Sequence, residues 1–557
     1  MDMEISDSSD ESINGSRRKT SRLRILSSSS DEDFVNTNSE VNECSTEEED
    51  FESKSENEDH DEEWQEVRER TSVINKYSEE EEFLFENTDC NDPVALYKLF
   101  FTDYILEKIV EETNEYAAQC INNSSSSSRT HQQAWQSVTR DEMNTFIGIL
   151  LIMGVVRLPE IRLYWSNSDM YANARIKNAM KRDRFLSILK FLHFSDNTTA
   201  RTEDRLYKIR NIVEAIVDTF KSAIKPGKNI VIDESMVPWR GRLGFRQYIP
   251  GKRHKYGIKL YKLCLPGGYT YNIDIYAGKN ATAITKTHSH DVVMKLMSGL
   301  LSEGRILFTD SYYTSVPLAE ELLEKKTFIC GIVKMNRKFL PPQTKRKQHR
   351  GGIMSLENRN GVKFLKWTDK RPVCMLSTCE NHMCTIIQGK NNKLKPDTVF
   401  FYNDAKKGVD LSDHMSSNYS CLRKTVKWYR NIIIQLICGT CLVNAWYIHK
   451  KWGNKHINTL KFREHIIDHL LVNNYRSEEM AIGKQIPSKS DSHFLHSYEG
   501  PTRKTRQRCK ECYKCLYKKK GREYAAKKTK KVTTYCNRCK GQPTLCIKCF
   551  KKLHRNT

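Results

Sequence analysis

Apolar and polar positions recur along the chain with two different periods, which divide it into helical and strand-forming regions. Apolar residues recur at helical spacing from residue 92 onward, and Pro93 suits the first turn of a helix. The same spacing predicts further helices over residues 141–156, 182–194 and 211–224. This part of the chain is therefore expected to be helical.

After Gly227 the period changes to that of β-strands. Four short runs are rich in β-branched or aromatic residues: NIVIDESMV, KYGIKLYKLCL, YTYNIDIYAG and RILFTDSYY. Pro266 and the two glycines that follow it indicate a hairpin turn between the second and third runs. These runs predict a sheet. Basic residues are concentrated just after position 334, and we interpret residues 335–397 as an insertion. The stretch from Trp428 to Trp452 is apolar on nearly all sides over its middle, which predicts a helix buried in a bundle.

Charge is distributed unevenly along the chain. Among 557 residues, 91 are Lys or Arg and 69 are Asp or Glu, which gives a net charge of +22. Residues 1–90 hold 29 acidic and 9 basic side chains, so the remainder carries a net charge of +42. A positively charged surface of this size normally binds a polyanion, and nucleic acid is the leading class of partner. A generically solvated basic surface is the alternative.

The N-terminal region differs in amino-acid composition from the rest of the chain. Residues 1–85 are rich in Ser and acidic residues and poor in apolar ones, so we expect them to be disordered. Ser8, Ser30 and Ser45 each have an acid three residues on, a pattern that suits an acid-directed kinase. Phosphorylation there would make this acidic region more negative.

Neither a membrane span nor a signal peptide is evident. The longest uncharged apolar run, residues 145–156, has 12 residues, which is too short to cross a bilayer. The N-terminus lacks the basic and apolar regions of a signal peptide. We therefore expect no membrane partner and no secretion. The 18 Cys of such a chain favour reduced thiols or metal ligands over disulfides.

Three aspartates stand where acidic side chains can converge. Asp233 ends one apolar strand run, Asp310 ends another, and Asp410 stands where a helix should start. Magnesium binds through a few carboxylate oxygens plus waters and substrate phosphates, so three such acids suit two-metal phosphoryl transfer. Spacing alone leaves the alternative open that these residues cap turns.

Four separate blocks resemble the piggyBac family of DNA transposases. The blocks are DESMVPWRGRLGFRQYIPGKRHKYGIKLY from Asp233, FTDSYYTS around Asp310, GVDLSDHM around Asp410 and RKTVKWYR around Trp428. They occur in the family's order, and the likeness runs from about residue 92 to the C-terminus. Asp233, Asp310 and Asp410 fall on the family's catalytic, metal-binding positions for Mg²⁺ or Mn²⁺, and Asp413 on a further carboxylate near the active site.

The resemblance implies a fold and a reaction. The fold is an α/β ribonuclease H-like catalytic core with a β-rich insertion, flanked by a discontinuous all-α dimerisation and DNA-binding domain, with a small C-terminal cross-brace zinc domain. The implied regions are an acidic N-terminal region (1–85), a helical domain in two parts (86–228 and 420–486), a catalytic domain (229–419) with its insertion (335–397), a linker (487–504) and a Cys-rich domain (505–557). The reaction is cut-and-paste transposition, in which hairpins form on the terminal inverted repeats and the ends join to TTAA target DNA.

Several basic residues are candidate DNA contacts. A glycine-broken stretch beside the expected active site can reach phosphates, and it contains Arg240, Arg242, Arg246, Lys252 and Arg253. Lys334, Arg337 and Lys338, at the mouth of the insertion, resemble family positions that touch target DNA. Trp428 falls on the position of a tryptophan that contacts unpaired DNA near the active site. The alternatives are plain surface charge for each basic residue and a core position for the tryptophan.

The C-terminal region contains paired cysteines at the spacing of zinc ligands. The candidate ligands are Cys509, Cys512, Cys536, Cys539, Cys546, Cys549 and His554, with Cys515 also available. Seven or eight ligands bind two Zn²⁺ ions, and the metals would stabilise a segment with few apolar side chains. Cys515 remains an open assignment. Two other groups are expected to pack as apolar side chains: Cys438 and Cys441 within the buried helix, and Cys374, Cys379, His382 and Cys384 near a strand.

We therefore expect an active transposase that acts as a homodimer in the nucleus on double-stranded DNA. A domesticated, non-catalytic descendant that binds DNA or chromatin is the main alternative. A ubiquitin ligase that uses the zinc region is a third and less favoured hypothesis, because that region is strongly basic.

Overall fold

The computed structural model describes residues 64–67, 77–122, 135–199, 203–252, 254–278, 287–380, 382, 384–388, 394–481, 495–498, 505–536, 539 and 541–554. Chain contacts separate residues 1–46 from residues 47–557. The first of these units lies wholly outside the described residues, as do the three candidate phosphorylation sites and the DNA-contact candidate Arg253.

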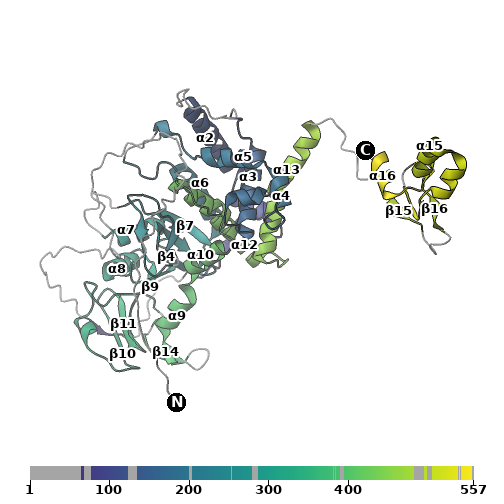
Figure 1. Ribbon diagram of the computed structural model, residues 1–557. Coiled ribbons are helices and arrows are strands. Elements are labelled where there is room, and N and C mark those ends of the chain that lie inside the picture. The colour runs from purple at the N-terminus through teal and green to yellow at the C-terminus, as the bar shows by residue number, and fades with distance from the viewer. Residues whose placement is uncertain are drawn as a thin grey trace, which may run out of the picture. The chain divides into compact units, whose positions relative to one another are not determined.

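A mixed sheet forms the centre of the second unit (Figure 1). Its central strands are β4 (Asn229–Pro238), β6 (Tyr256–Cys264), β7 (Thr270–Ile275), β8 (Ile306–Thr309) and β9 (Phe328–Ile332). β4 pairs with β8 in parallel and with β6 antiparallel, and β9 continues the parallel part beyond β8. β5 (Gln247–Tyr248) and β7 pair with β6. The turn predicted at Pro266 connects β6 to β7, which confirms that hairpin.

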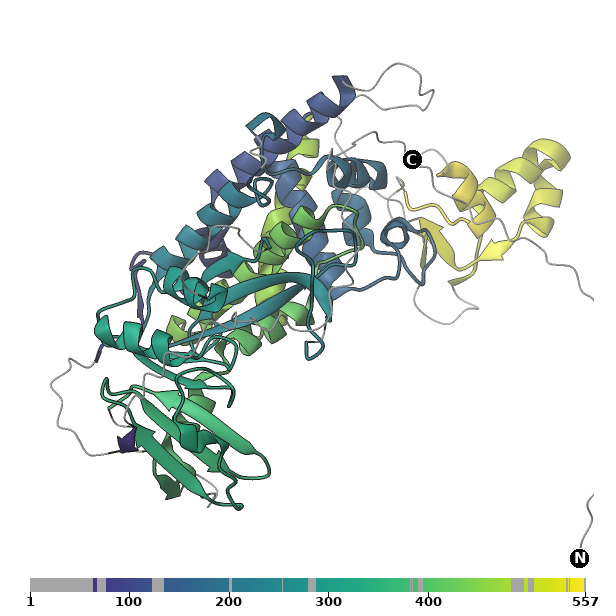
Figure 2. The same cartoon turned by 90° about the vertical axis from the view of Figure 1, so that its left-hand side faces the viewer.

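The insertion continues this sheet. β10 (Ile353–Glu357), β11 (Lys363–Thr368) and β12 (Pro372–Ser377) form an antiparallel meander whose last strand pairs with β9. Figure 2 shows these green strands at its lower left. β13 (Ile386–Gln388) and β14 (Leu394–Pro396) form a separate hairpin before α9 (Asp397–Ala405) and α10 (Gly408–Asn418).

Two stretches of the region predicted to be disordered are instead paired strands. β1 (Gln65–Glu66) pairs with β10, and β2 (Glu82–Phe83) pairs with β3 (Ile224–Lys225). Aromatic residues hold these stretches: the ring of Trp64 packs edge-on against Phe364 at 6.3 Å, and Tyr77 is buried against the guanidinium of Arg305 at 4.2 Å. Figure 2 shows the purple β1 beside the green strands.

Helices from two distant parts of the chain pack together. The first set is α1 (Pro93–Phe100), α2 (Asp103–Asn122), α3 (Arg140–Val155), α4 (Ala174–Ala179), α5 (Arg182–Phe191) and α6 (Arg210–Ala223). The second set is α11 (Trp428–Gln435), α12 (Cys441–Trp452) and α13 (Thr459–Ala481), with a π-helical turn between the first two. α3 packs against α13 and α1 against α12. Figure 1 shows the blue α3 beside the yellow-green α13.

The predicted helices are confirmed with small changes at their ends. α3 begins where the side chain of Thr139 accepts a hydrogen bond from the N–H of Glu142. α5 ends at Phe191, three residues before the predicted end, and the carbonyl of the next residue, Leu192, accepts a hydrogen bond from Arg430. Trp428–Trp452 is the one described helical stretch long and apolar enough to cross a membrane, and 83% of its most apolar window is buried within the protein. This burial confirms the prediction that residues 428–452 form a helix in the interior of a helical bundle.

The C-terminal module contains short strands and two helices. Its elements are β15 (Leu495–Ser497), β16 (Gln507–Arg508), α15 (Lys510–Lys528), β17 (Lys531–Val532), β18 (Thr534–Cys536) and α16 (Ile547–Leu553). β16 pairs with β17 and β15 with β18, so residues 495–497, predicted to lie in the linker 487–504, instead form a strand of this module. Its small buried centre consists of three cysteines and Leu545, which leaves little apolar surface to stabilise it.

Two further helices pack against the central sheet. α7 (His288–Leu296) contacts β6 and β7, and α8 (Val316–Glu324) contacts β9 and β12.

Candidate functional site

Adjacent parallel strands bring two of the predicted aspartates together. Ile232 of β4 lies opposite Thr309, the last residue of β8. Asp233 is the next residue within β4, and Asp310 directly follows the end of β8. Oxygens of Asp233, Glu234 and Asp310 lie within 4.8 Å of one another. The two aspartates lie close together, as predicted. The prediction that Asp233 ends its strand is wrong, because β4 continues to Pro238. Glu234 is a further carboxylate of the cluster that the sequence did not point to.

The carboxylates are placed where ionisation is costly. Burial and, next, the charge of Glu234 raise the pKa of Asp233 from 3.8 to about 8, and the same two causes raise the pKa of Asp310 to about 6. The buried Glu234 Oε2 has no hydrogen-bond partner among the described residues. A cluster of hard oxygen donors with an unsatisfied buried oxygen fits a divalent cation such as Mg²⁺ or Mn²⁺.

Two lysines lie beside this acidic cluster. Lys252 Nζ donates a hydrogen bond to the carbonyl of Glu234 at 2.8 Å and lies 4.0 Å from Asp233 Oδ1 and 3.9 Å from Glu234 Oε1. Lys259 Nζ lies 4.0 Å from the centre of the Tyr312 ring, and burial lowers its pKa. Lys252, which we expected at DNA phosphates, therefore balances carboxylate charge in this structure.

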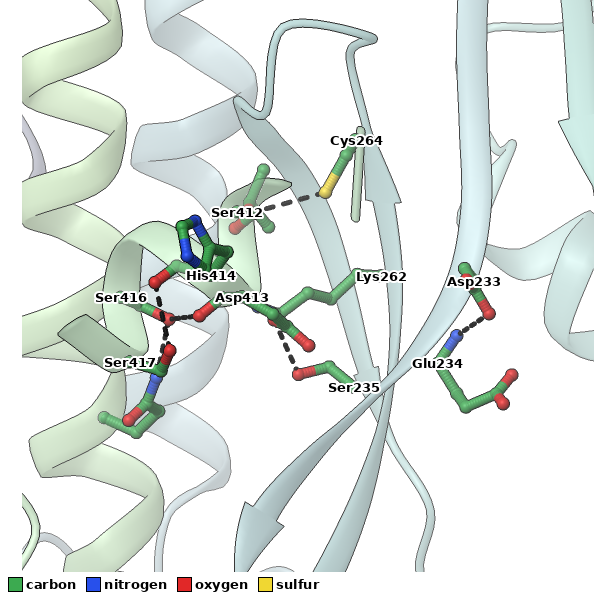
Figure 3. Close-up of polar contacts among 12 residues, drawn as sticks. Asp233, Glu234, Ser235, Lys262, Cys264, Ser412, Asp413, His414, Ser416 and Ser417 are labelled. Carbon is green, nitrogen blue, oxygen red and sulfur yellow. Dashed lines mark hydrogen bonds and ion pairs between the residues drawn. The ribbon is translucent and has the colours of Figure 1, made fainter. Parts of the chain in front are cut away.

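Asp410 and Asp413 lie on α10, which packs against β4 and β6. Asp410, in the first turn, is exposed and is not one of the three clustered carboxylates. Burial lowers the pKa of Lys252, yet four carboxylates together raise it by more: those of Asp233, Glu234, Asp410 and Asp413. Asp410 therefore lies close enough to act on this lysine. Asp413 instead binds Lys262 and Ser235 (Figure 3).

The predicted DNA-contact residues lie in different environments. Arg240, Arg242, Lys334 and Lys338 are exposed. Arg246 is half-buried, with its guanidinium over the ring of Tyr256 at 5.4 Å.

Arg337 and Trp428 have specific protein contacts. Arg337 donates hydrogen bonds to the carbonyl of Tyr312 at 2.6 Å and of Ser311 at 3.4 Å, so it holds the loop that follows Asp310. Trp428 is half-buried at the start of α11 and packs edge-on against Phe245 at 5.2 Å.

The cysteines of the C-terminal module form two groups. Cys509 and Cys512 meet Cys546 and Cys549, with the sulfur of Cys512 lying 3.5 Å from that of Cys549. In this group the N–H of Cys546 donates to the sulfur of Cys509 at 3.2 Å. Four thiols within 4.8 Å of one another match a closed tetrahedral zinc site.

The second group consists of Cys536, Cys539 and His554. His554 Nε2 lies 3.2 Å from the sulfur of Cys539, and its Nδ1 lies 2.9 Å from the carbonyl of Phe550. A proton on Nδ1 would be donated to that carbonyl, which leaves the Nε2 lone pair facing the thiols. Cys515 is exposed on α15 and belongs to neither group.

The two cysteine groups expected to pack as apolar side chains do so. Cys438 and Cys441 are buried in the helical core. His382 binds the hydroxyl of Ser377 through Nδ1 at 2.7 Å, and within the described residues no metal-binding group includes it or its neighbouring cysteines.

The chain is similar to a known protein family, to human proteins and to a solved structure. A family model described as Transposase IS4 matches residues 92–446. Human PiggyBac transposable element-derived protein 3 is 27% identical over 446 residues, which cover 76% of this chain and 72% of that protein. Human PiggyBac transposable element-derived protein 2 is 26% identical over 396 residues, covering 67% of this chain and 64% of that protein. A cryo-EM structure of the piggyBac transposase synaptic complex with hairpin DNA superimposes with a TM-score of 0.63 and 25% identity, over 78% of this chain and 96% of that one.

Proposed function

The chain belongs to the piggyBac transposase family, and from this premise we propose that it is a metal-dependent DNA transposase of the cut-and-paste type. The observation that carries the proposal is the convergence of Asp233 and Glu234 within β4 with Asp310, which follows β8. Its substrates would be the terminal inverted repeats of a transposon and TTAA target DNA. The solved relative in complex with hairpin DNA supports DNA as the partner and a hairpin as the intermediate form of the ends.

The protein's own residues would bind the metals and orient the DNA. Asp233 and Asp310 would hold Mg²⁺ or Mn²⁺, with Asp410 completing the set from α10. When bound, such ions activate a water or a 3′-hydroxyl and stabilise the leaving oxygen of an in-line displacement. The exposed Arg240 and Arg242 would contact phosphates, and these contacts set affinity without reading sequence.

The domain organisation proposed for the enzyme follows the family. A ribonuclease H-like catalytic domain would span residues 229–419, and the helices on either side of it would form one dimerisation and DNA-binding domain. We propose two zinc ions for the C-terminal module, one at the four-cysteine group and one at the group containing His554. The homodimer would act in the nucleus.

A second candidate function has its own support. The human relatives are transposable element-derived proteins by name, so a domesticated protein that binds DNA without cutting it would fit the same fold. The two functions differ in one measurable property, which is metal-dependent cleavage of DNA.

A nicking assay with labelled transposon ends and Mg²⁺ tests the proposal. The wild-type protein should nick the ends, whereas Asp233→Ala, Asp310→Ala and Asp410→Ala should bind them and leave them intact. Asp183→Ala is a matched control, because Asp183 pairs with Arg182 on the exposed surface of α5. Failure of the wild-type protein to cleave under any metal condition, with binding retained, would favour the domesticated function.

A further inference from the structure

Lys262 is a buried cation directly opposite a candidate metal ligand. In the antiparallel pair of β4 and β6, Lys262 is the cross-strand partner of Asp233. Side chains in that relation share one face of the sheet, with Cβ atoms about 4.5–5.5 Å apart. The side chain of Lys262 is only 1% exposed. A buried ammonium requires a counter-ion. The strand register makes Asp233 one carboxylate that could be the counter-ion of Lys262.

The structure gives Lys262 a different counter-ion. Lys262 Nζ donates to Asp413 Oδ1 at 2.7 Å, and the hydroxyl of Ser235 donates to the same oxygen at 2.8 Å (Figure 3). Ser235 is two residues from Asp233 on the same strand, and therefore on the same face. Figure 3 shows Lys262 and Ser235 reaching Asp413, whereas the carboxylate of Asp233 is directed to the N–H of Glu234.

We propose that Asp413 is a positioning residue that draws the ammonium of Lys262 away from Asp233 and so leaves Asp233 free to bind a metal ion. This inference rests on the proposed function, because it assumes that Asp233 is a metal ligand. One oxygen of Asp413 already accepts two hydrogen bonds, one from a cation. Held in this way, Asp413 would serve as the counter-ion of Lys262 and not as a metal ligand.

The same contact fixes the helix that carries Asp410. Asp413 lies three residues after Asp410, so both lie on one side of α10. Near Asp413, the hydroxyl of Ser412 hydrogen-bonds that of Thr270 at 2.9 Å. At the start of the helix, a Cβ added to Gly408 would lie 2.5 Å from the carbonyl oxygen of Leu265, so only glycine allows this close approach. Asp410 lies between these attachments.

The test compares Mn²⁺ binding by the full-length chain and three variants: Asp413→Asn, Lys262→Met and the double variant. Asp413→Asn keeps the shape of the side chain but removes the counter-ion of Lys262, so Lys262 should turn to Asp233. A neighbouring opposite charge changes the proton affinity of a carboxylate about 10-fold to 1,000-fold, and we expect Mn²⁺ affinity to fall at least about tenfold. The double variant removes both charges, and its affinity should return to within about threefold of wild type. Free Mn²⁺ is measured by electron paramagnetic resonance.

The double variant decides between the two roles of Asp413. If Asp413 is a metal ligand, removing Lys262 cannot restore binding, and a double variant as weak as Asp413→Asn would overturn the inference. Should Asp413→Asn fail to fold, the double variant carries the test alone, since it removes the buried ammonium together with its counter-ion. Asp233→Ala is measured in parallel. If it binds Mn²⁺ as tightly as wild type, the proposed function fails; if it binds weakly and the double variant is not rescued, only the role of Asp413 fails.

Discussion

Replacing Asp233 with asparagine should stabilise the metal-free protein at alkaline pH. The pKa of Asp233 is 3.8 in an unfolded chain and about 8 in the folded protein, chiefly because of burial. The folded protein therefore keeps a proton on Asp233 that the unfolded chain releases as pH rises from about 4 to 8. Because the folded state binds more protons in that window, the unfolding free energy falls as pH rises through it.

The structure sets the size of this effect. Each tenfold change in proton affinity is worth 1.36 kcal/mol, so the raised pKa of Asp233 costs on the order of a few kcal/mol above pH 8. Asparagine removes the charge but still buries a polar amide, which offsets part of the gain. We expect a net stabilisation of about 2–4 kcal/mol at pH 8.5 and much less at pH 5.

Thermal unfolding in EDTA at pH 5, 7 and 8.5 measures this difference. In EDTA, Asp233→Asn should unfold several degrees above wild type at pH 8.5. In a separate series without EDTA, added Mn²⁺ should raise the midpoint of the wild-type protein more than that of the variant. Asp183→Asn, on the exposed surface of α5, is the control and should change the midpoint little at any pH. If Asp233→Asn is no more stable than wild type at pH 8.5, then ionisation of Asp233 does not lower the free energy of unfolding, and the reasoning is refuted.

Three further perturbations have expected outcomes. Cys512→Ser should release zinc and unfold the C-terminal module, because this thiol lies within 3.8 Å of two others; zinc content and limited proteolysis measure this, and an unchanged zinc content would contradict it. Arg337→Ala should slow DNA cleavage more than it weakens end binding, because Arg337 holds the loop after Asp310; equal losses in nicking and gel-shift assays would favour a direct DNA contact. Deleting residues 1–63, an acidic stretch, should tighten DNA binding most at low salt; fluorescence anisotropy at two ionic strengths measures this, and equal affinity at low salt would refute it.

The sequence predicts those features that follow from a regular period. Apolar spacing gave the helices α3, α5 and α6 to within a few residues at each end. The convergence of Asp233 and Asp310 was also predictable, because two parallel neighbouring strands bring residues at equivalent positions together. In both cases the backbone repeat determines where the side chain lies.

Features that depend on single contacts were not predictable. Alternation along a strand places Glu234 on the face opposite Asp233, yet Asp233 Oδ1 accepts a hydrogen bond from the N–H of Glu234 at 2.7 Å and the two carboxylates share one cluster. The composition of an acidic segment gives no sign that Trp64 and Tyr77 find aromatic and cationic partners. Likewise, a basic residue such as Arg337 can bind backbone carbonyls as readily as phosphates.

The energetic cost of the acidic cluster bears on which of the two functions the chain performs. A protein that only bound DNA would be more stable with neutral side chains at Asp233 and Asp310, since burial raises the pKa of both. It would also bind phosphates better without three carboxylates beside Lys252. Each cost disappears when a divalent cation binds, because the ion favours the charged form of every carboxylate. A cluster that destabilises the empty protein and opposes DNA binding is therefore better explained by metal-dependent cleavage than by DNA binding alone.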